Sequence, residues 1–161
     1  MNNSKPWRAF WFVLVAALIV VADQLIKNAV IANLMPQQSY NWLGSVVRLY
    51  LTYNDSAAFS MGFGITWIFT LISACAAVAI VWFGLRTKTR LWSALGGLAL
   101  GGVVGNLTDR LFRAPGFPSG HVVDYIQIPF NFPIFNLADS AIVVAACLTV
   151  IAVARGSKVG G

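Results

Sequence analysis

Four long apolar segments are the feature that most restricts how this chain can fold. They cover residues 9–31, 65–85, 91–112 and 137–154, and each is close to the roughly 20 residues that a helix needs to cross about 30 Å of hydrocarbon. The 161-residue chain is also 58% hydrophobic and only 10% charged, unlike a water-soluble domain. We therefore expect one integral membrane domain over residues 1–161, with an all-α core of four transmembrane helices.

The basic residues predict how these helices are oriented, because Lys and Arg in short loops are retained on the cytoplasmic side. Both termini should therefore be cytoplasmic. The net charge of +6 follows from this sorting and from the anionic headgroups of the inner leaflet, so we expect membrane lipids as partners and no nucleic acid. Seven basic residues share the predicted cytoplasmic side: Lys5, Arg8, Arg86, Lys88, Arg90, Arg155 and Lys158.

The sequence predicts no metal site and no disulfide. His121 stands alone in a loop, and Cys75 and Cys147 lie inside the second and fourth spans, where thiols usually act as buried small apolar side chains. No spacing of His and Cys typical of a metal centre is present.

An outer segment between the first two spans predicts β-structure over about residues 40–60. Residues 46–53 are rich in β-branched and aromatic side chains and are flanked by turn residues. Residues 122–128 show the same composition before the fourth span. These two strands could pair into a small sheet that lies against the membrane and satisfies backbone groups near the interface.

Most acidic residues are predicted to lie in one shallow layer at the outer membrane surface. With a rise of about 1.5 Å per residue, Asp23 lies roughly 20 Å along the first span and Asp109 roughly 27 Å along the third. Asp139 begins the fourth span from that surface, and Asp124 precedes it. The layer holds four of the five acidic residues with their polar neighbours: Asp23, Asp109, Asp124 and Asp139, with Lys27, Asn106, Arg110 and Asn136.

Within this layer, Asp124 and Asp139 are the candidate catalytic pair. A carboxylate near hydrocarbon is expensive unless it is paired, protonated or functional. Two neighbouring carboxyl groups cannot both ionise easily, so one can keep its proton while the other acts as a base. Asn136 is a suitable N-cap for the fourth helix, and the helix N-terminus favours an ionised Asp139. Asp124 is then the expected acid, although the titration belongs to the pair.

Other hydrolytic chemistries lack their residues in this sequence. No G-x-S-x-G or H-E-x-x-H motif occurs, and no Ser, Cys or Lys nucleophile with a positioned base is evident on the outer side. Two other functions stay open: a small proton-coupled transporter or channel subunit that uses Asp23, Asp109 and Asp139 as a relay, and a scaffold whose outer sheet grips a partner. Polar groups gathered at one depth favour a hydrolase, because a relay needs them through the membrane.

Two further patterns have a structural interpretation. Asp23 and Lys27 are four residues apart, so that they share one helix face; a structural ion pair and a direct role in the site remain equally open. Gly97, Gly101 and Gly105 recur at four-residue spacing in the third span, which allows another helix to approach closely.

In their joint order, several motifs resemble those of the bacterial lipoprotein signal peptidases, also called signal peptidase II. The resemblance extends through nearly the whole chain. It rests on D-Q-L-I-K at residues 23–27, Asn54 followed by A-A-F-S at 57–60, G-N-L-T-D-R at 105–110, V-V-D-Y-I at 122–126 and F-N-L-A-D-S at 135–140.

The resemblance implies an aspartyl endopeptidase with four transmembrane helices and an outer β-cradle. Its two catalytic aspartates would fall on Asp124 and Asp139, and its substrate would be a diacylglyceryl-modified prolipoprotein, cut just before the lipidated cysteine. The enzyme would need no cofactor, would act as a monomer in the bacterial inner membrane, and would place its active site near the outer leaflet. Supporting positions would fall on Asp23, Lys27, Asn54, Asn106, Asp109, Arg110 and Asn136.

One position departs from the family pattern. The family commonly has glycine two residues after the conserved asparagine, whereas this chain has Ser56 after Asn54. If that position needs a positive φ, serine would be strained there.

Overall fold

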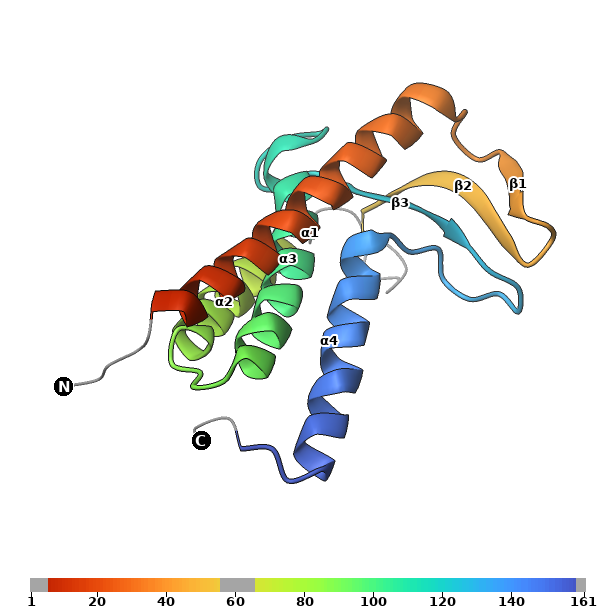
Figure 1. Cartoon of the computed structure of the whole chain (residues 1–161). Helices are drawn as coiled ribbons and strands as arrows, with labels where there is room; N and C mark the ends of the chain where they lie inside the picture. The colour runs from red at the N-terminus through yellow and green to blue at the C-terminus, as the bar shows by residue number, and fades with distance from the viewer. Residues whose placement is uncertain (1–5, 56–65, 159–161) are drawn as a thin grey trace.

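The computed structural model describes residues 6–55 and 66–158, and four long helices dominate it. All four are long and apolar enough to cross a membrane. Their bounds agree with the four predicted spans to within a few residues, so that prediction is confirmed. The helices are α1 (Pro6–Asn33), α2 (Thr66–Gly84), α3 (Arg90–Phe112) and α4 (Leu137–Ala154) (Figure 1).

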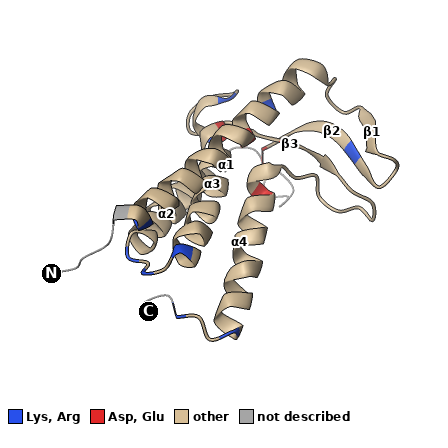
Figure 2. Cartoon of the chain, in the orientation of Figure 1, with Lys and Arg blue, Asp and Glu red and all other residues tan. Residues whose placement is uncertain are grey.

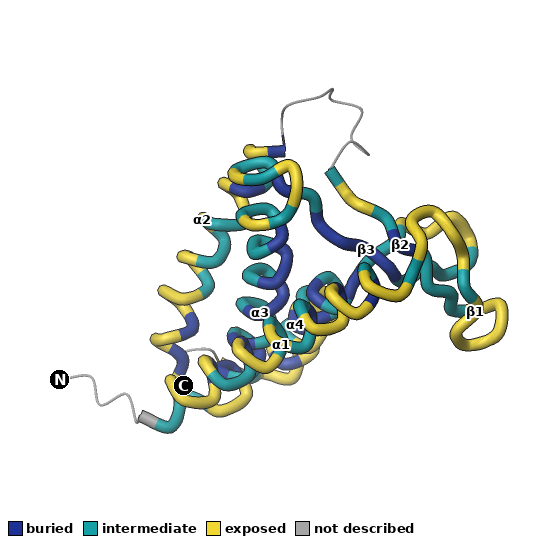
Figure 3. The backbone as a smooth tube through the Cα atoms, turned by 90° about the horizontal axis from the view of Figure 1, so that it is seen from above, coloured by how far each residue is buried: buried dark blue, intermediate teal, exposed yellow. Residues whose placement is uncertain are grey.

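Helix α3 is the central helix and packs against the other three (Figure 3). In its apolar span 44% of the residues are buried, against 11% in α2. Its glycines make the close approach possible: a Cβ on Gly97 would lie 2.5 Å from the carbonyl oxygen of Phe12, and one on Gly101 would lie 2.9 Å from that of Ala16. The predicted packing role of the glycine repeat is therefore confirmed, with α1 as the partner helix.

A three-stranded antiparallel sheet lies beyond the outer ends of the helices. Its strands are β1 (Ser39–Leu43), β2 (Val47–Asn54) and β3 (Val122–Gln127), in the order β1-β2-β3. The two predicted strands are confirmed to within one residue at either end. Strand β1 was not predicted separately, because its five residues are mostly exposed and lack apolar alternation.

A small apolar core fixes the sheet against the outer end of α1. Val30 of α1, Leu51 of β2, and Val123 and Tyr125 of β3 form this cluster, and Val123 is fully buried. Burial of these side chains stabilises the contact. Asp124 lies between Val123 and Tyr125 on β3, and both of these belong to the cluster. The core therefore also fixes the position of the Asp124 backbone.

Charge is sorted along the helices. The described N- and C-terminal ends lie at the same end of the bundle, and the basic residues of the α2–α3 connection and of the segment after α4 gather there, while the acidic residues lie at the opposite end beside the sheet (Figure 2). This is the layering that the depth count predicted.

Candidate active site

The two candidate catalytic aspartates come from different elements that meet at the outer end of the bundle. Asp124 is the third residue of β3 and is 2% exposed. Asp139 is the third residue of α4 and is half-buried. The charge of Asp139 acts on Asp124, so the two carboxyl groups form an interacting pair, which we call the candidate dyad.

Two asparagines connect the carboxyl groups of the candidate dyad. Asn136 Nδ2 lies 2.6 Å from Asp124 Oδ1, and Asn106 Nδ2 lies 2.7 Å from Asp139 Oδ1. The asparagines also bond to each other, since Asn136 Nδ2 donates to Asn106 Oδ1 at 3.1 Å. A continuous chain of three hydrogen bonds therefore runs from one aspartate to the other.

A third asparagine reaches Asp124 from the neighbouring strand. Asn54, at the end of β2, donates from Nδ2 to Asp124 Oδ2 at 2.8 Å. Both oxygens of the Asp124 carboxyl group therefore accept a side-chain amide hydrogen bond. The aspartate is held in a fixed orientation even though it is buried.

The N-terminus of α4 orients Asp139 through a reciprocal cap. The side chain of Asn136, the N-cap, accepts from the backbone N–H of Asp139 at 2.9 Å, and Asp139 Oδ2 accepts from the backbone N–H of Asn136 at 3.1 Å. Such a capping box satisfies two free amides of the first turn. The predicted N-cap is confirmed, and Asp139 is the third residue of the helix.

Tyr125 was not predicted as a site residue, but it contributes to the same helix terminus. Its hydroxyl oxygen accepts from the backbone N–H of Leu137, the first residue of α4, at 3.2 Å. Burial, together with the nearby aspartates, raises the pKa of Tyr125 to about 12, so the phenol keeps its proton. Its position in V-V-D-Y-I gives no sequence signal for this role, because the contact depends on where α4 begins.

Below the candidate dyad, Lys27 is fully buried and all three of its donors are used. Its Nζ lies 2.8 Å from Asp23 Oδ2, 2.7 Å from Asp109 Oδ2 and 2.9 Å from Asn106 Oδ1. An ammonium group has three N–H donors, so this arrangement satisfies it completely. The predicted ion pair of Asp23 and Lys27 is confirmed, and the pair also contacts an asparagine of the dyad network.

The two buried aspartates of this cluster fix the backbone immediately before each member of the candidate dyad. Asp109 Oδ2 accepts from the backbone N–H of Val123 at 3.2 Å, and Asp23 Oδ1 accepts from the backbone N–H of Ala138 at 3.1 Å. Lys27 bonds to both carboxylates. One buried charge cluster therefore fixes the relative position of β3 and α4, and with it the position of the dyad.

A second ring of polar side chains surrounds Asp109 and was missed from sequence. Arg113 Nε lies 2.5 Å from Asp109 Oδ1, and Gln24 Nε2 lies 3.1 Å from the same oxygen. Arg113 also donates to Gln24 Oε1 at 3.2 Å. The i, i+4 spacing of Asp109 and Arg113 could have indicated this pair, whereas nothing in the sequence distinguishes Gln24.

Arg110 occupies a different position from the other supporting residues. Its Nε is buried and has no hydrogen-bond partner among the described residues, yet its charge acts on Asp139 and Asp124. A guanidinium beside two carboxyl groups, with donors still available, can bind a further acceptor such as a peptide carbonyl.

The environment of Asp124 favours its protonated form. Burial raises its pKa to about 6, and the charge of Asp139 adds to this, while the hydrogen bonds from Asn54 and Asn136 act in the opposite direction. A carboxyl group with such a pKa can hold a proton near neutrality and release it. This agrees with the prediction that Asp124 is the acid of the pair.

All nine predicted site residues fall within the described residues, and eight share one hydrogen-bonded network. Arg110 lies beside that network, and its buried Nε has no hydrogen-bond partner among the described residues. Ser56, where the sequence departs from the family pattern, lies outside the described residues. The eight are Asp23, Lys27, Asn54, Asn106, Asp109, Asp124, Asn136 and Asp139.

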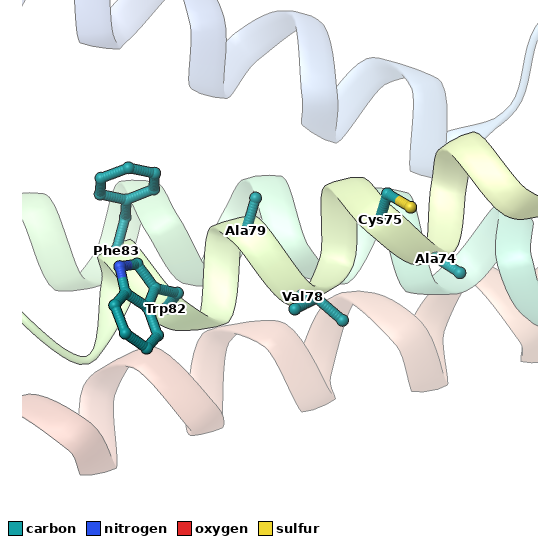
Figure 4. Close-up of a pocket in the computed structure, with 6 residues that line it drawn as sticks. All are labelled: Ala74, Cys75, Val78, Ala79, Trp82 and Phe83. Carbon is teal, nitrogen blue, oxygen red and sulfur yellow. The ribbon is translucent and has the colours of Figure 1, made fainter.

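Other parts of the described chain offer less chemistry. Among residues 6–55 and 66–158, no three His, Cys, Asp or Glu side chains are placed to hold a metal ion. A groove of about 530 Å³ on the outer face of α2 is almost wholly apolar and is bounded at one end by Trp82 and Phe83 (Figure 4). Cys75 lies in this groove. Both it and Cys147 are exposed, so the expectation of buried thiols was wrong; the helices turn these side chains outward.

Comparisons with known proteins agree with this geometry. Residues 15–155 match the family model described as signal peptidase (SPase) II. The chain is 44% identical over 147 residues to a lipoprotein signal peptidase of Leifsonia xyli, covering 91% of this chain and 68% of the relative. It is 43% identical over 148 residues to one of Rhodococcus jostii, covering 91% and 74%.

Solved structures support the same fold. A bacterial membrane enzyme determined by the in meso method at 1.9 Å superposes with a TM-score of 0.79 at 26% identity, over 88% of this chain and 91% of the other. A second, at 2.3 Å, gives a TM-score of 0.78 at 25% identity, over 91% and 89%.

Proposed function

Because the chain belongs to the signal peptidase II family of lipoprotein signal peptidases, we propose that Asp124 and Asp139 carry out its catalysis. The protein is an aspartic peptidase that removes signal peptides from lipid-modified prolipoproteins. The observation that supports the residue assignment is the chain of hydrogen bonds that joins the two carboxyl groups through Asn136 and Asn106. A transporter or channel subunit is not supported by this family membership.

In the proposed reaction, Asp139 is the base and Asp124 is the acid. Asp139 takes a proton from a water molecule, and the water oxygen attacks the carbonyl carbon of the scissile peptide. When the tetrahedral intermediate collapses, the C–N bond breaks and Asp124 gives its proton to the departing amine nitrogen. The raised pKa of Asp124 and the half-exposed position of Asp139 at a helix N-terminus support this division.

Arg110 is proposed to face the substrate. Its guanidinium lies where it interacts with both carboxyl groups, and its buried Nε has no hydrogen-bond partner among the described residues. A donor in that place can stabilise the negative charge that develops on the carbonyl oxygen during attack. The buried cluster of Lys27, Asp23 and Asp109 acts differently, by holding β3 and α4 in register.

The depth of the candidate dyad suggests how the substrate is cut. The signal peptide would lie in the bilayer as a helix, with its end beside the outer termini of α3 and α4. The cut would fall just before the diacylglyceryl-modified cysteine, where the chain emerges from the hydrocarbon. Asp139 is only half-buried, so water at this depth would have access to its carboxyl group.

We further propose that the protein is a multi-pass protein of the bacterial inner membrane and forms a single domain over residues 1–161. Both termini would be cytoplasmic, and the active site would lie near the outer leaflet. The basic residues that cluster at the end shared by the described termini support this orientation (Figure 2). All the groups of the candidate dyad network come from one chain, which supports a monomer as the working enzyme.

The substrate assignment is tested with purified enzyme and one prolipoprotein in two forms, with and without the diacylglyceryl group. We expect release of the signal peptide from the lipid-modified form, with the modified cysteine as the new N-terminal residue by mass spectrometry. Equal cleavage of the unmodified form would contradict the proposed specificity, and a cut elsewhere would contradict the proposed cleavage position.

A further inference from the structure

The far end of the outer sheet exposes a set of large apolar side chains. The sheet extends to one side of the helices in both views (Figures 1 and 3), and in Figure 1 the loop between β3 and α4 reaches away from α4 at about the level of its first turns. The exposed side chains come from the β1–β2 hairpin and from this loop. They are Trp42, Leu43, Val46, Phe130 and Phe132, and Phe130 is 99% exposed.

The backbone of the loop is strained where it presents Phe130. Phe130 and Asn131 both have positive φ values, 69° and 55°. A left-handed conformation is unfavourable for a residue with a side chain, and asparagine tolerates it better than phenylalanine. Because Phe130 makes almost no contact with the described chain, packing within the protein does not offset this cost. Contact with a partner outside the chain would offset it.

A cleft of about 440 Å³ lies directly behind the two phenylalanines. It is lined by Arg48 and Gln127, which are paired across β2 and β3, and by Phe130, Asn131 and Phe132. None of the three ion pairs between described residues involves Arg48, and the lining contains no acidic side chain. The cleft therefore combines an uncompensated guanidinium with aromatic walls.

We propose that this cleft holds the phosphate of a phospholipid of the outer leaflet, bound by Arg48, while Phe130 and Phe132 lie among the glycerol and upper acyl chains. Guanidinium groups bind phosphate oxygens through charge-assisted hydrogen bonds, and aromatic side chains collect at the headgroup level of membranes. The loop has that depth because it reaches about the level of the first turns of α4 (Figure 1).

This lipid contact would affect the active site by fixing its depth. Strand β3, which carries Asp124, continues directly into the lipid-facing loop. Phospholipid bound at Arg48 would therefore hold the sheet, and the candidate acid, at a set height relative to the hydrocarbon. The inference rests on the proposed membrane orientation but not on the catalytic assignment.

The depth of the loop is tested with a fluorophore at position 130. Cys75 and Cys147 are both exposed, so they are first replaced by alanine to prevent labelling there. Phe130→Cys is then introduced into this chain, and the new cysteine is labelled in phosphatidylglycerol bilayers. The matched control is Phe117→Cys, a 75% exposed phenylalanine in the outer loop after α3. We expect doxyl groups on the acyl chains to quench the label at 130, and aqueous iodide to quench the label at 117. Quenching of both labels by iodide alone would overturn the proposal.

The role of Arg48 is tested with the same label in detergent, titrated with short-chain phosphatidylglycerol. Arg48→Gln should weaken the binding that the label reports by about fivefold, the effect of one basic residue near an anionic surface. A phosphate-free glycolipid should bind the two forms equally, and inorganic phosphate should not replace the phospholipid. Unchanged binding by Arg48→Gln, or displacement by inorganic phosphate, would overturn the proposal. Neither measurement needs cleavage activity, so its outcome is separate from that of the proposed function.

Discussion

The ammonium of Lys27 lies 2.7 Å from Oδ2 of Asp109, and both side chains are completely buried. Replacement of Lys27 by Met would leave the buried carboxylate of Asp23 without a cation and that of Asp109 with Arg113 alone. Loss of one partner of such a pair costs about 3–5 kcal/mol, so we expect Lys27→Met to unfold at a much lower temperature in detergent. Lys88→Met, in the exposed α2–α3 connection, is the matched control. An unchanged unfolding temperature would contradict the stabilising role of the cluster.

Removal of the Asn54 amide should change the pH dependence of cleavage. Its hydrogen bond opposes the effect of burial, which raises the pKa of Asp124 to about 6. If protonated Asp124 is the acid, kcat/KM falls as pH rises through this pKa. Asn54→Ala should raise the pKa further and move this alkaline limb to higher pH. The control is Asn41→Ala, on exposed β1; a limb that stays in place or moves to lower pH would contradict the assignment.

Tyr125→Phe tests whether the first amide of α4 contributes to the positioning of Asp139. The change keeps the ring in the core but removes the oxygen that accepts from Leu137 N–H. A buried amide left without its acceptor costs about 1–3 kcal/mol. We expect kcat to fall several-fold with little change in KM, because the substrate contacts remain. Tyr50→Phe on β2 is the control, and equal kcat values for the two variants would argue against this role.

Gly102→Ala should separate α3 from α4 beside the site. A Cβ at this position would overlap the carbonyl oxygen of Ala138, the residue before Asp139. Backbone cannot move away as a side chain can, so we expect a large loss of cleavage activity. At Gly96, by contrast, a Cβ would lie 3.1 Å from a ring carbon of Phe12, which can shift. Gly96→Ala should keep most activity; similar losses in both variants would contradict this explanation.

The helices and the layer of polar residues could be predicted because their signals are local. Hydropathy alone predicts the observed bounds of the fourth span. The helical rise per residue is enough to predict that Asp23 and Asp109 lie at the same depth as Asp139. The asparagine at the N-cap follows from the preference for a side-chain oxygen before the first turn.

The pairings within the layer could not be predicted because they depend on helix rotation and packing. Lys27 meets Asp109 only because the α3 glycines let α1 approach closely. The Tyr125 hydroxyl meets Leu137 only because the segment just before α4 pairs with β3 through backbone hydrogen bonds between Ile126 and Phe135. Strand β1 is formed by pairing with β2, and its own sequence shows no alternation that would reveal it.

The most direct test of the account is cleavage of a diacylglyceryl-modified prolipoprotein by Asp124→Asn and Asp139→Asn, measured as the rate of signal-peptide release. Asn keeps the size of the side chain but can neither accept nor deliver the proton, so each variant should lose at least about a hundredfold in rate. Asn41→Ala, at an exposed position of β1, should remain active, and thermal unfolding should show that all three variants are folded. Cleavage near the wild-type rate by either dyad variant would contradict the assignment of Asp124 and Asp139 as the catalytic pair.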